Sequence, residues 1–146
     1  MTRPQTVLAF DFGLKRIGIA CGDTLTRHGA ARAAAAVHRG VPDWEAIARE
    51  VRALAPAILV VGAPYNVDGS EGTLLAAARR FAAELERRFA LPVQLVDERF
   101  SSLEASEALK RRRASGARGR IERAAIDSAA AAVILGRWFQ GEGEGT

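Results

Sequence analysis

Two short apolar segments joined by an amphipathic one constrain the fold of this chain more than any other feature. Residues 57–62 (AILVVG) and 93–97 (VQLVD) have the length of strands, and residues 73–89 between them repeat apolar side chains every three or four positions. A continuous apolar run such as 57–62 is typical of a strand buried on both faces. Strand, helix and strand in this order predict a right-handed parallel crossover in an α/β sheet.

The N-terminal segments predict an antiparallel addition to that sheet. Residues 6–11 (TVLAFD) and 17–21 (IGIAC) are apolar runs separated by residues 13–16 (GLKR), which is the pattern of a β-hairpin. Residues 30–39 are ambiguous, because their alanines favour a helix whereas their place after a hairpin favours a third antiparallel strand. The complete prediction is a mixed five-stranded sheet flanked by helices, an arrangement that resembles the ribonuclease H-like fold.

Three further helices are predicted. Asp43 caps a helix that Pro56 stops, with apolar side chains recurring on one face between them. Residues 101–104 (SSLE) form a capping box for a helix that reaches about Arg112. The last helix is expected from about Glu122 to Gln140, with Asp127 near its beginning.

The length of 146 residues suits one domain and is too short for two. We expect a single domain over residues 1–140, followed by a disordered tail at residues 141–146 (GEGEGT), which has nothing to bury. The formal net charge of +4 permits binding of a polyanion without requiring it. Since the sequence has no apolar signal core and no run long enough to span a bilayer, we expect a cytoplasmic protein without membrane contact.

The sulfur and imidazole side chains offer little chemistry. Cys21 is the single cysteine, so that neither an internal disulfide nor a cysteine metal framework can form. Because it lies inside an apolar run, we expect a buried core cysteine rather than a catalytic thiol. His28 and His38 are expected to be surface or structural residues, since nothing pairs them at ligand spacing.

Three acidic residues carry the candidate chemistry: Asp11 closes the first strand, Glu98 follows residues 93–97, and Asp127 belongs to the last helix. Taken singly, Asp11 could be a turn residue, Glu98 a partner of Arg99, and Asp127 an early-helix acid favoured by the helix dipole. The carboxyl ends of parallel strands share one edge of a sheet, however, which brings the acids together. Clustered carboxylates suit Mg²⁺ or Mn²⁺, and two such ions about 4 Å apart promote phosphodiester cleavage.

Basic residues lie close to these acids in the sequence. Residues 110–123 contain seven cations and one acid, Glu122, which is explained equally well by a solvated face or by a grip on a phosphate backbone. The loop of residues 66–72 precedes a helix N-terminus, where it is either a phosphate site or a plain turn capped by Ser70. The predicted nucleic-acid contacts are Lys15, Arg16, Asn66, Arg99, Arg111, Arg112, Arg113, Arg118 and Arg120.

Four groups of residues resemble the YqgF family, also called RuvX, of pre-16S ribosomal RNA nucleases and Holliday junction resolvases. They are residues 8–13 (LAFDFG) with 16–20 (RIGIA), 61–66 (VGAPYN) with 68–70 (DGS), 97–102 (DERFSS) with 104–105 (EA), and 127–130 (DSAA). The departures from the family pattern are Ala63, where a larger aliphatic residue is common, and residues 100–102. Neither departure changes a proposed ligand.

The resemblance implies a ribonuclease H-like fold related to RuvC resolvases. It further implies that Asp11, Glu98 and Asp127 are metal-binding catalytic acids, with Mg²⁺ or Mn²⁺ as the cofactor. The implied role is maturation of the 5′ end of 16S ribosomal RNA.

Three functional hypotheses stay open at this point. The first is a nuclease acting on structured RNA, and the second is a resolvase acting on branched DNA, which needs two sites in a symmetric dimer. The third is a non-catalytic ribosome-assembly factor that binds RNA through its arginines. An actin-like ATPase, which also contains the D-x-G pattern, is discounted because one chain of this length lacks the second fold. The oligomeric state is expected to be a monomer or a homodimer.

Overall fold

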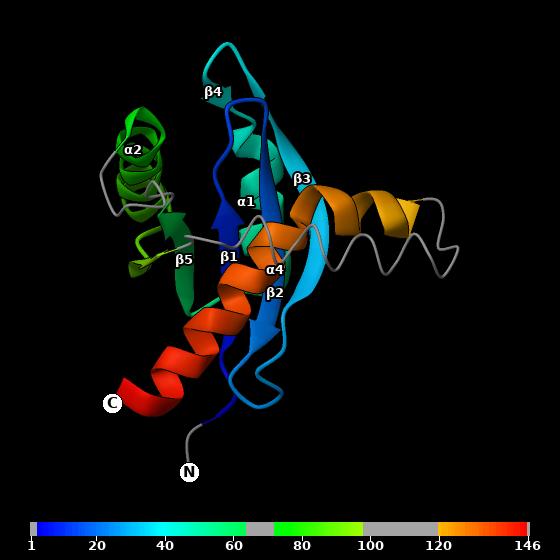
Figure 1. Cartoon of the computed structure of the whole chain (residues 1–146), viewed down its shortest axis with the longest axis vertical. Coiled ribbons are helices and arrows are strands. Elements are labelled where there is room, and N and C mark those ends of the chain that lie inside the picture. The colour runs from blue at the N-terminus through cyan, green and yellow to red at the C-terminus, as the bar shows by residue number, and fades with distance from the viewer. Residues whose placement is uncertain (1–2, 64–71, 98–119, 146) are drawn as a thin grey trace.

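The computed structural model describes residues 3–63, 72–97 and 120–145, which form one mixed sheet with helices on both of its faces (Figure 1). Its strand order is β4-β3-β2-β1-β5-β6. The strands are β1 (Thr6–Asp11), β2 (Arg16–Asp23), β3 (Ala30–His38), β4 (Val41–Pro42), β5 (Ile58–Ala63) and β6 (Val93–Asp97). The described helices are α1 (Trp44–Leu54), α2 (Thr73–Phe89) and α4 (Arg120–Gly145).

Strand β1 lies at the junction of the antiparallel and parallel parts of the sheet. It pairs antiparallel with β2, as the hairpin prediction requires, and parallel with β5, which in turn pairs parallel with β6. The crossover β5-α2-β6 is therefore confirmed, and α2 and β6 have the predicted bounds.

The ambiguous alanine-rich segment is strand β3, which pairs antiparallel with β2. The helix propensity of alanine is a small preference, and the open edge of β2 offers a full ladder of hydrogen bonds that outweighs it. The predicted count of five strands is wrong by one, because a two-residue strand, β4, follows β3. Arg39 and Gly40 between them both have positive φ, at 52° and 79°, as a tight hairpin turn requires.

Helix α1 begins where the sequence predicts. The Ala46 N–H donates to Asp43 Oδ1 at 3.1 Å, which caps the helix. Ala55 adopts the left-handed conformation at the other end, just before Pro56. The helix predicted at residues 101–112 lies outside the described residues.

Helix α4 differs from the prediction at both ends. It begins at Arg120 rather than Glu122 and continues to Gly145 rather than Gln140, so that the tail expected to be disordered from Gly141 is helical as far as Gly145. Adding a residue to an existing helix forms one hydrogen bond for each residue fixed, which extends the helix past the last residue with an apolar contact. No helix among the described residues is long and apolar enough to cross a membrane.

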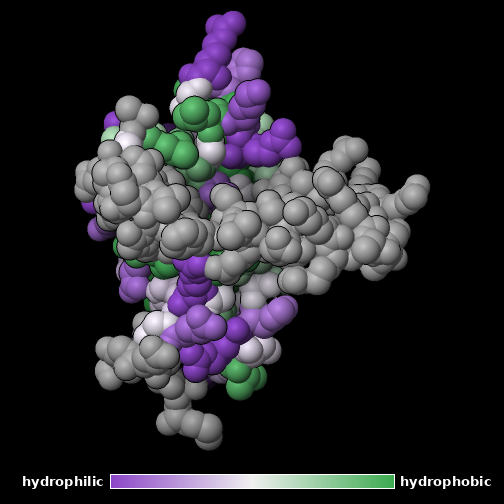
Figure 2. Space-filling view, viewed as in Figure 1, coloured by the Kyte–Doolittle hydropathy of each residue, from purple (hydrophilic) through white to green (hydrophobic). Residues whose placement is uncertain are grey.

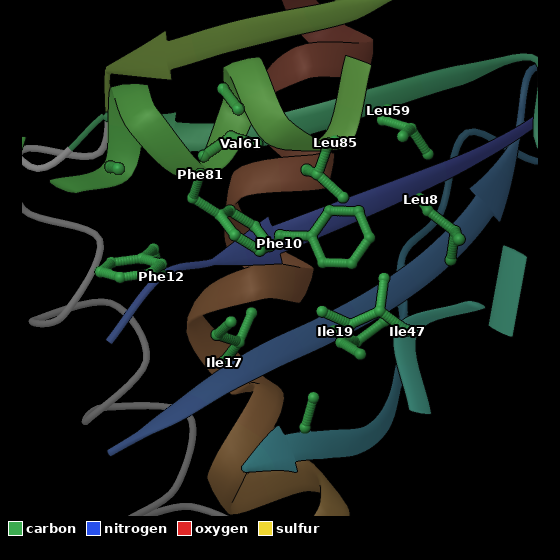
Figure 3. Close-up of a cluster of buried hydrophobic side chains, with 13 residues drawn as sticks. Leu8, Phe10, Phe12, Ile17, Ile19, Ile47, Leu59, Val61, Phe81 and Leu85 are labelled. Carbon is green, nitrogen blue, oxygen red and sulfur yellow. The ribbon is translucent and has the colours of Figure 1, made fainter. Parts of the chain in front are cut away.

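The sheet buries a separate hydrophobic cluster on each face. On one side α1 and α2 cover large side chains, among them Leu8 and Phe10 of β1, whose labelled neighbours point toward one another in Figure 3. On the other side α4 covers Val7 and Ala9 of the same strand. Alternate residues of β1 therefore belong to opposite clusters, which fixes the direction of each side chain on this strand.

Candidate active site

Asp11 is the last residue of β1, opposite Gly18 of β2, and its side chain is half-buried. Since side chains alternate along a strand, Asp11 follows Val7 and Ala9 and belongs to the face of the sheet that α4 covers. Phe12, the next residue, packs in the cluster on the opposite face.

The parallel strands β1, β5 and β6 end at one edge of the sheet, as predicted. Phe10 of β1 pairs with Val61 of β5, and Val61 pairs with Leu95 of β6. The last residues of β5 and β6, Ala63 and Asp97, pair with each other. Glu98 follows Asp97 directly in the sequence and lies outside the described residues.

Asp127 lies further into the last helix than the sequence predicts. Helix α4 starts at Arg120, which places Asp127 seven residues further on, about two turns into the helix. The helix dipole acts within the first turn. Stabilisation by the dipole therefore does not explain this acid.

Ser128, the residue after Asp127, joins α4 to the sheet through two hydrogen bonds. Its Oγ accepts from the Ile19 N–H at 2.9 Å and donates to the Arg32 carbonyl at 2.6 Å, and the side chain has no exposed surface. Both partners lie at an irregularity of the β2–β3 pairing, where Ile17 opposes Ala35 but Ile19 opposes Arg32. Strand β3 thus has one extra residue there, a β-bulge that takes these backbone groups out of the regular ladder.

Sequence reasoning assigned no role to Ser128. The available signal was one hydroxyl residue at the head of a run of alanines and aliphatic residues (SAAAAVIL). A serine in such a run is either solvent-facing or bonded to a backbone group.

The predicted basic contacts are only partly within the described residues. Lys15 and Arg16 are exposed at the β1–β2 turn, where the Val37 N–H donates to the Lys15 carbonyl at 2.9 Å. Figure 2 shows hydrophilic side chains gathered at the end of the molecule where this turn and β4 lie. Arg120 is the first residue of α4. The other predicted contacts lie outside the described residues: Asn66, Arg99, Arg111, Arg112, Arg113 and Arg118.

Cys21 is partly buried at the edge of the larger cluster, rather than fully buried as expected. Burial raises the pKa of its thiol, and the Arg32 guanidinium opposes this shift only in part. A neutral thiol is a poor nucleophile, which agrees with the prediction that Cys21 is not catalytic. His28 and His38 are exposed, as expected.

Within the described part of the chain, no three side chains of Asp, Glu, His or Cys lie close enough to hold a metal ion. A cavity of about 430 Å³ lies on the opposite face, between the β1–β2 turn, β4, α1 and α2. None of the described residues predicted for the site lines this cavity, whose walls include Phe12, Leu14, Val41 and Trp44. Asp11, the described strand residue of the candidate site, lies on the other face, which α4 covers.

The chain is similar to a family of known proteins over almost its whole length. The model of the family described as "RuvX: Holliday junction resolvase" matches residues 5–141. Proteins named "Putative pre-16S rRNA nuclease" are 46% identical over 134 residues in Coxiella burnetii (91% of each chain) and 44% identical over 145 residues in Xanthomonas campestris (99% of this chain, 94% of the relative). A third, from Edwardsiella ictaluri, is 42% identical over 139 residues, covering 95% of this chain and 97% of the relative.

The solved structure of Thermus thermophilus RuvC in complex with a Holliday junction substrate has the same fold. It aligns with a TM-score of 0.53 and 14% identity, covering 97% of this chain and 98% of RuvC. The predicted ribonuclease H-like fold is confirmed. The chain belongs to the RuvX family, whose members are named as nucleases and resolvases, hydrolases of phosphodiester bonds.

Proposed function

We propose that this protein is a metal-dependent nuclease that processes the 5′ end of the 16S ribosomal RNA precursor, with Asp11, Glu98 and Asp127 as its catalytic acids. The observation that carries the proposal is the hydrogen bond from the Ile19 N–H to the Ser128 hydroxyl, because Ser128 is the residue that follows Asp127. Ile19 in turn pairs with Phe10, the neighbour of Asp11. Two acids separated by 116 positions in the sequence are thereby tied to adjacent strands.

The donor set fits a hard divalent cation. Asp11 lies on the α4 face at the end of β1, Asp127 is four residues before Ala131, which is buried against that face, and Glu98 follows β6 in the sequence. Carboxylate oxygens are the ligands that Mg²⁺ and Mn²⁺ prefer. Such a metal would activate water for attack on phosphorus and stabilise the leaving oxygen.

The residues of the chain itself supply orientation and charge. Asp11 extends from the last position of a strand held on both sides, by β2 and by β5, so that its backbone is fixed before a ligand binds. The exposed cations Lys15 and Arg16 lie on the turn that follows and would neutralise a phosphate backbone passing over this edge. The remaining proposed contacts to nucleic acid are Asn66, Arg99, Arg111, Arg112, Arg113, Arg118 and Arg120.

Structured RNA is the substrate that we propose, and branched DNA is the alternative. The names of the curated relatives favour RNA, whereas the family description and the RuvC likeness favour a junction. A monomer would suit an RNA nuclease, whereas a resolvase needs a homodimer with two sites. We also propose a cytoplasmic location. The proposed single domain over residues 1–140 is supported by β1, which contributes to both hydrophobic clusters.

The test is cleavage of a 16S precursor RNA and of a four-way DNA junction by the wild type and by Asp11→Asn, each with Mn²⁺ or with EDTA. Loss of a single metal-ligating carboxylate is expected to lower the RNA cleavage rate at least about 100-fold, since the loss of an outer-shell partner alone commonly costs metal affinity 10- to 100-fold. Binding of the RNA should be retained.

Asp43→Asn is the matched control, because it makes the same chemical change at the cap of α1, where asparagine caps as well as aspartate. It should cleave at the wild-type rate. If the wild type leaves RNA intact in Mn²⁺ while still binding it, the protein is an assembly factor and the nuclease proposal fails. Metal-dependent cleavage of the junction alone would transfer the proposal to a resolvase.

A further inference from the structure

We propose that Ser128 is a positioning residue for the metal site: its hydroxyl locks α4 into the β-bulge between β2 and β3 and so places Asp127 against the end of β1 that carries Asp11. This inference rests on the proposed function, since it assumes that Asp127 binds the metal. The Ser128 hydroxyl makes two hydrogen bonds to the sheet directly beside Asp127, whereas the hydrogen bonds of Trp138 and Phe139 lie further along α4.

The geometry of the bridge restricts the helix in two ways. A hydroxyl has one proton, which Ser128 donates to the Arg32 carbonyl at 2.6 Å, and it uses a lone pair to accept from the Ile19 N–H at 2.9 Å. Because the two partners lie on different strands, the hydroxyl has to lie between them. Sliding α4 along its axis or rotating it would break one or both bonds and leave buried polar groups unpaired.

The apolar contacts of α4 do not have this directionality. Ala131, Ile134 and Leu135 lie against the sheet, and the apolar burial of such side chains has no preferred direction. Two other described hydrogen bonds hold the helix, from Trp138 Nε1 to Gln94 Oε1 at 2.8 Å and from the Arg27 guanidinium to the Phe139 carbonyl. Trp138 is ten residues beyond Ser128, about 15 Å along the axis, so it cannot set the position of Asp127 closely.

The path from Ser128 to the site is short. Asp127 is joined to Ser128 by one peptide bond, Ser128 to Ile19 by one hydrogen bond, and Ile19 is the partner of Phe10 in the β1–β2 ladder. Asp11 follows Phe10. The links are two covalent connections, one hydrogen bond from a backbone N–H to the Ser128 hydroxyl, and one backbone pairing. We therefore expect loss of the hydroxyl to move one acid relative to the other.

The experiment measures Mn²⁺ affinity by isothermal titration calorimetry, on the full chain and without any nucleic acid. Thermal unfolding followed by circular dichroism first sets a temperature at which every variant is folded. The variants are Ser128→Ala, Asp127→Asn, the double variant with both changes, and Trp138→Phe as the matched control. Trp138→Phe removes one hydrogen bond at the far end of the same helix while keeping an aromatic ring.

We expect Ser128→Ala to weaken Mn²⁺ binding about 10-fold, the lower range for loss of an outer-shell group at a metal site. Asp127→Asn should weaken it further, and adding Ser128→Ala to Asp127→Asn should change the affinity by less than about twofold, since Ser128 acts through Asp127. Trp138→Phe should bind Mn²⁺ as the wild type does. If Ser128→Ala does not fold, Ser128→Cys keeps the approximate volume with weaker hydrogen bonds and should still weaken binding by at least about threefold.

The two proposals fail in different ways. Unchanged affinity in Ser128→Ala or Ser128→Cys, together with a loss in Asp127→Asn, would overturn the positioning role and keep the metal site. If Ser128→Ala lowered the Mn²⁺ affinity equally in the wild type and in Asp127→Asn, the hydroxyl would act on the site by a route other than Asp127. A wild type that binds no Mn²⁺, or an Asp127→Asn variant that binds it fully, would instead contradict the proposed function.

Discussion

The two faces of the sheet differ in the size of the side chains that build them. Toward α1 and α2, β1 and β2 contribute large residues such as Phe10 and Ile19, whereas toward α4 they contribute the smaller residues Val7, Ala9 and Ala20. Large side chains fill the space beneath a helix and keep its backbone away from the strands. Small ones allow a close approach, so that a serine hydroxyl on α4 can reach the strand backbone. The face toward α1 and α2 therefore holds the larger hydrophobic cluster, and the face toward α4 is the one on which we propose the acids.

The largest expected effect of a substitution on stability is on the face with large side chains. Phe81 of α2 has ring contacts with Phe10, Phe12 and Trp44, at centroid distances of 5.7, 5.3 and 5.4 Å. Phe81→Ala should lower the free energy of unfolding by about 3–5 kcal/mol, through lost burial and the cavity left behind. Urea unfolding measures this loss. A change below about 1 kcal/mol would show that this face is not the main source of stability.

On the α4 face, adding a single methyl group is expected to matter. A Cβ on Gly29 would lie 3.0 Å from the Ala132 carbonyl of the helix, so that Gly29→Ala should lower the free energy of unfolding by about 1–3 kcal/mol. Gly136→Ala is the control in the same helix, because a Cβ there meets nothing within 4 Å and should stabilise the helix by about 0.5–1 kcal/mol. If both substitutions changed the free energy of unfolding in the same direction, α4 would not lie closely enough against this face for an added methyl group to matter.

The smallest expected effect concerns pH and Cys21, at the edge of the larger cluster. Because the folded-state pKa of the thiol is raised above its ordinary value of 9.0, its contribution to stability is complete below that pH. That contribution is lost as the pH rises through the folded-state pKa, since the unfolded thiol ionises first. Between pH 7 and pH 10, the free energy of unfolding measured by denaturation should decline less in Cys21→Ala than in the wild type. An identical decline in both would mean that the thiol does not contribute.

The parts of the fold that the sequence predicted are those with strong periodic patterns. Residues 73–89 and 93–97 were assigned with their observed bounds because apolar spacing alone distinguishes helix from strand there. The alanines of β3 have no such spacing, and their structure depends on pairing with β2. Strand β4 has only two residues and is too short for any periodic pattern.

The candidate site shows the same division. Asp11 could be placed at a strand end because the strand before it was clear. The depth of Asp127 in α4 could not be predicted, because it depends on where the helix begins. The bridge made by Ser128 could not be predicted, because it depends on where the helix lies on a bulge formed by two other strands. A bulge arises from the relative lengths of two paired segments, and no local run of residues encodes it.

The sequence distance spanned by the Ser128 bridge has a consequence for the synthesis of the protein. The Ile19 and Ser128 partners are 109 residues apart, and β1 acquires its parallel neighbour β5 only when residues 58–61 have been made. Contacts of such long range form late in folding, because closing the chain between them has an entropic cost. A nascent chain that ends before α4 therefore holds Asp11 without Asp127. With Asp11 and Asp127 as the proposed ligands, the nuclease would acquire its site only after nearly the whole chain has been made.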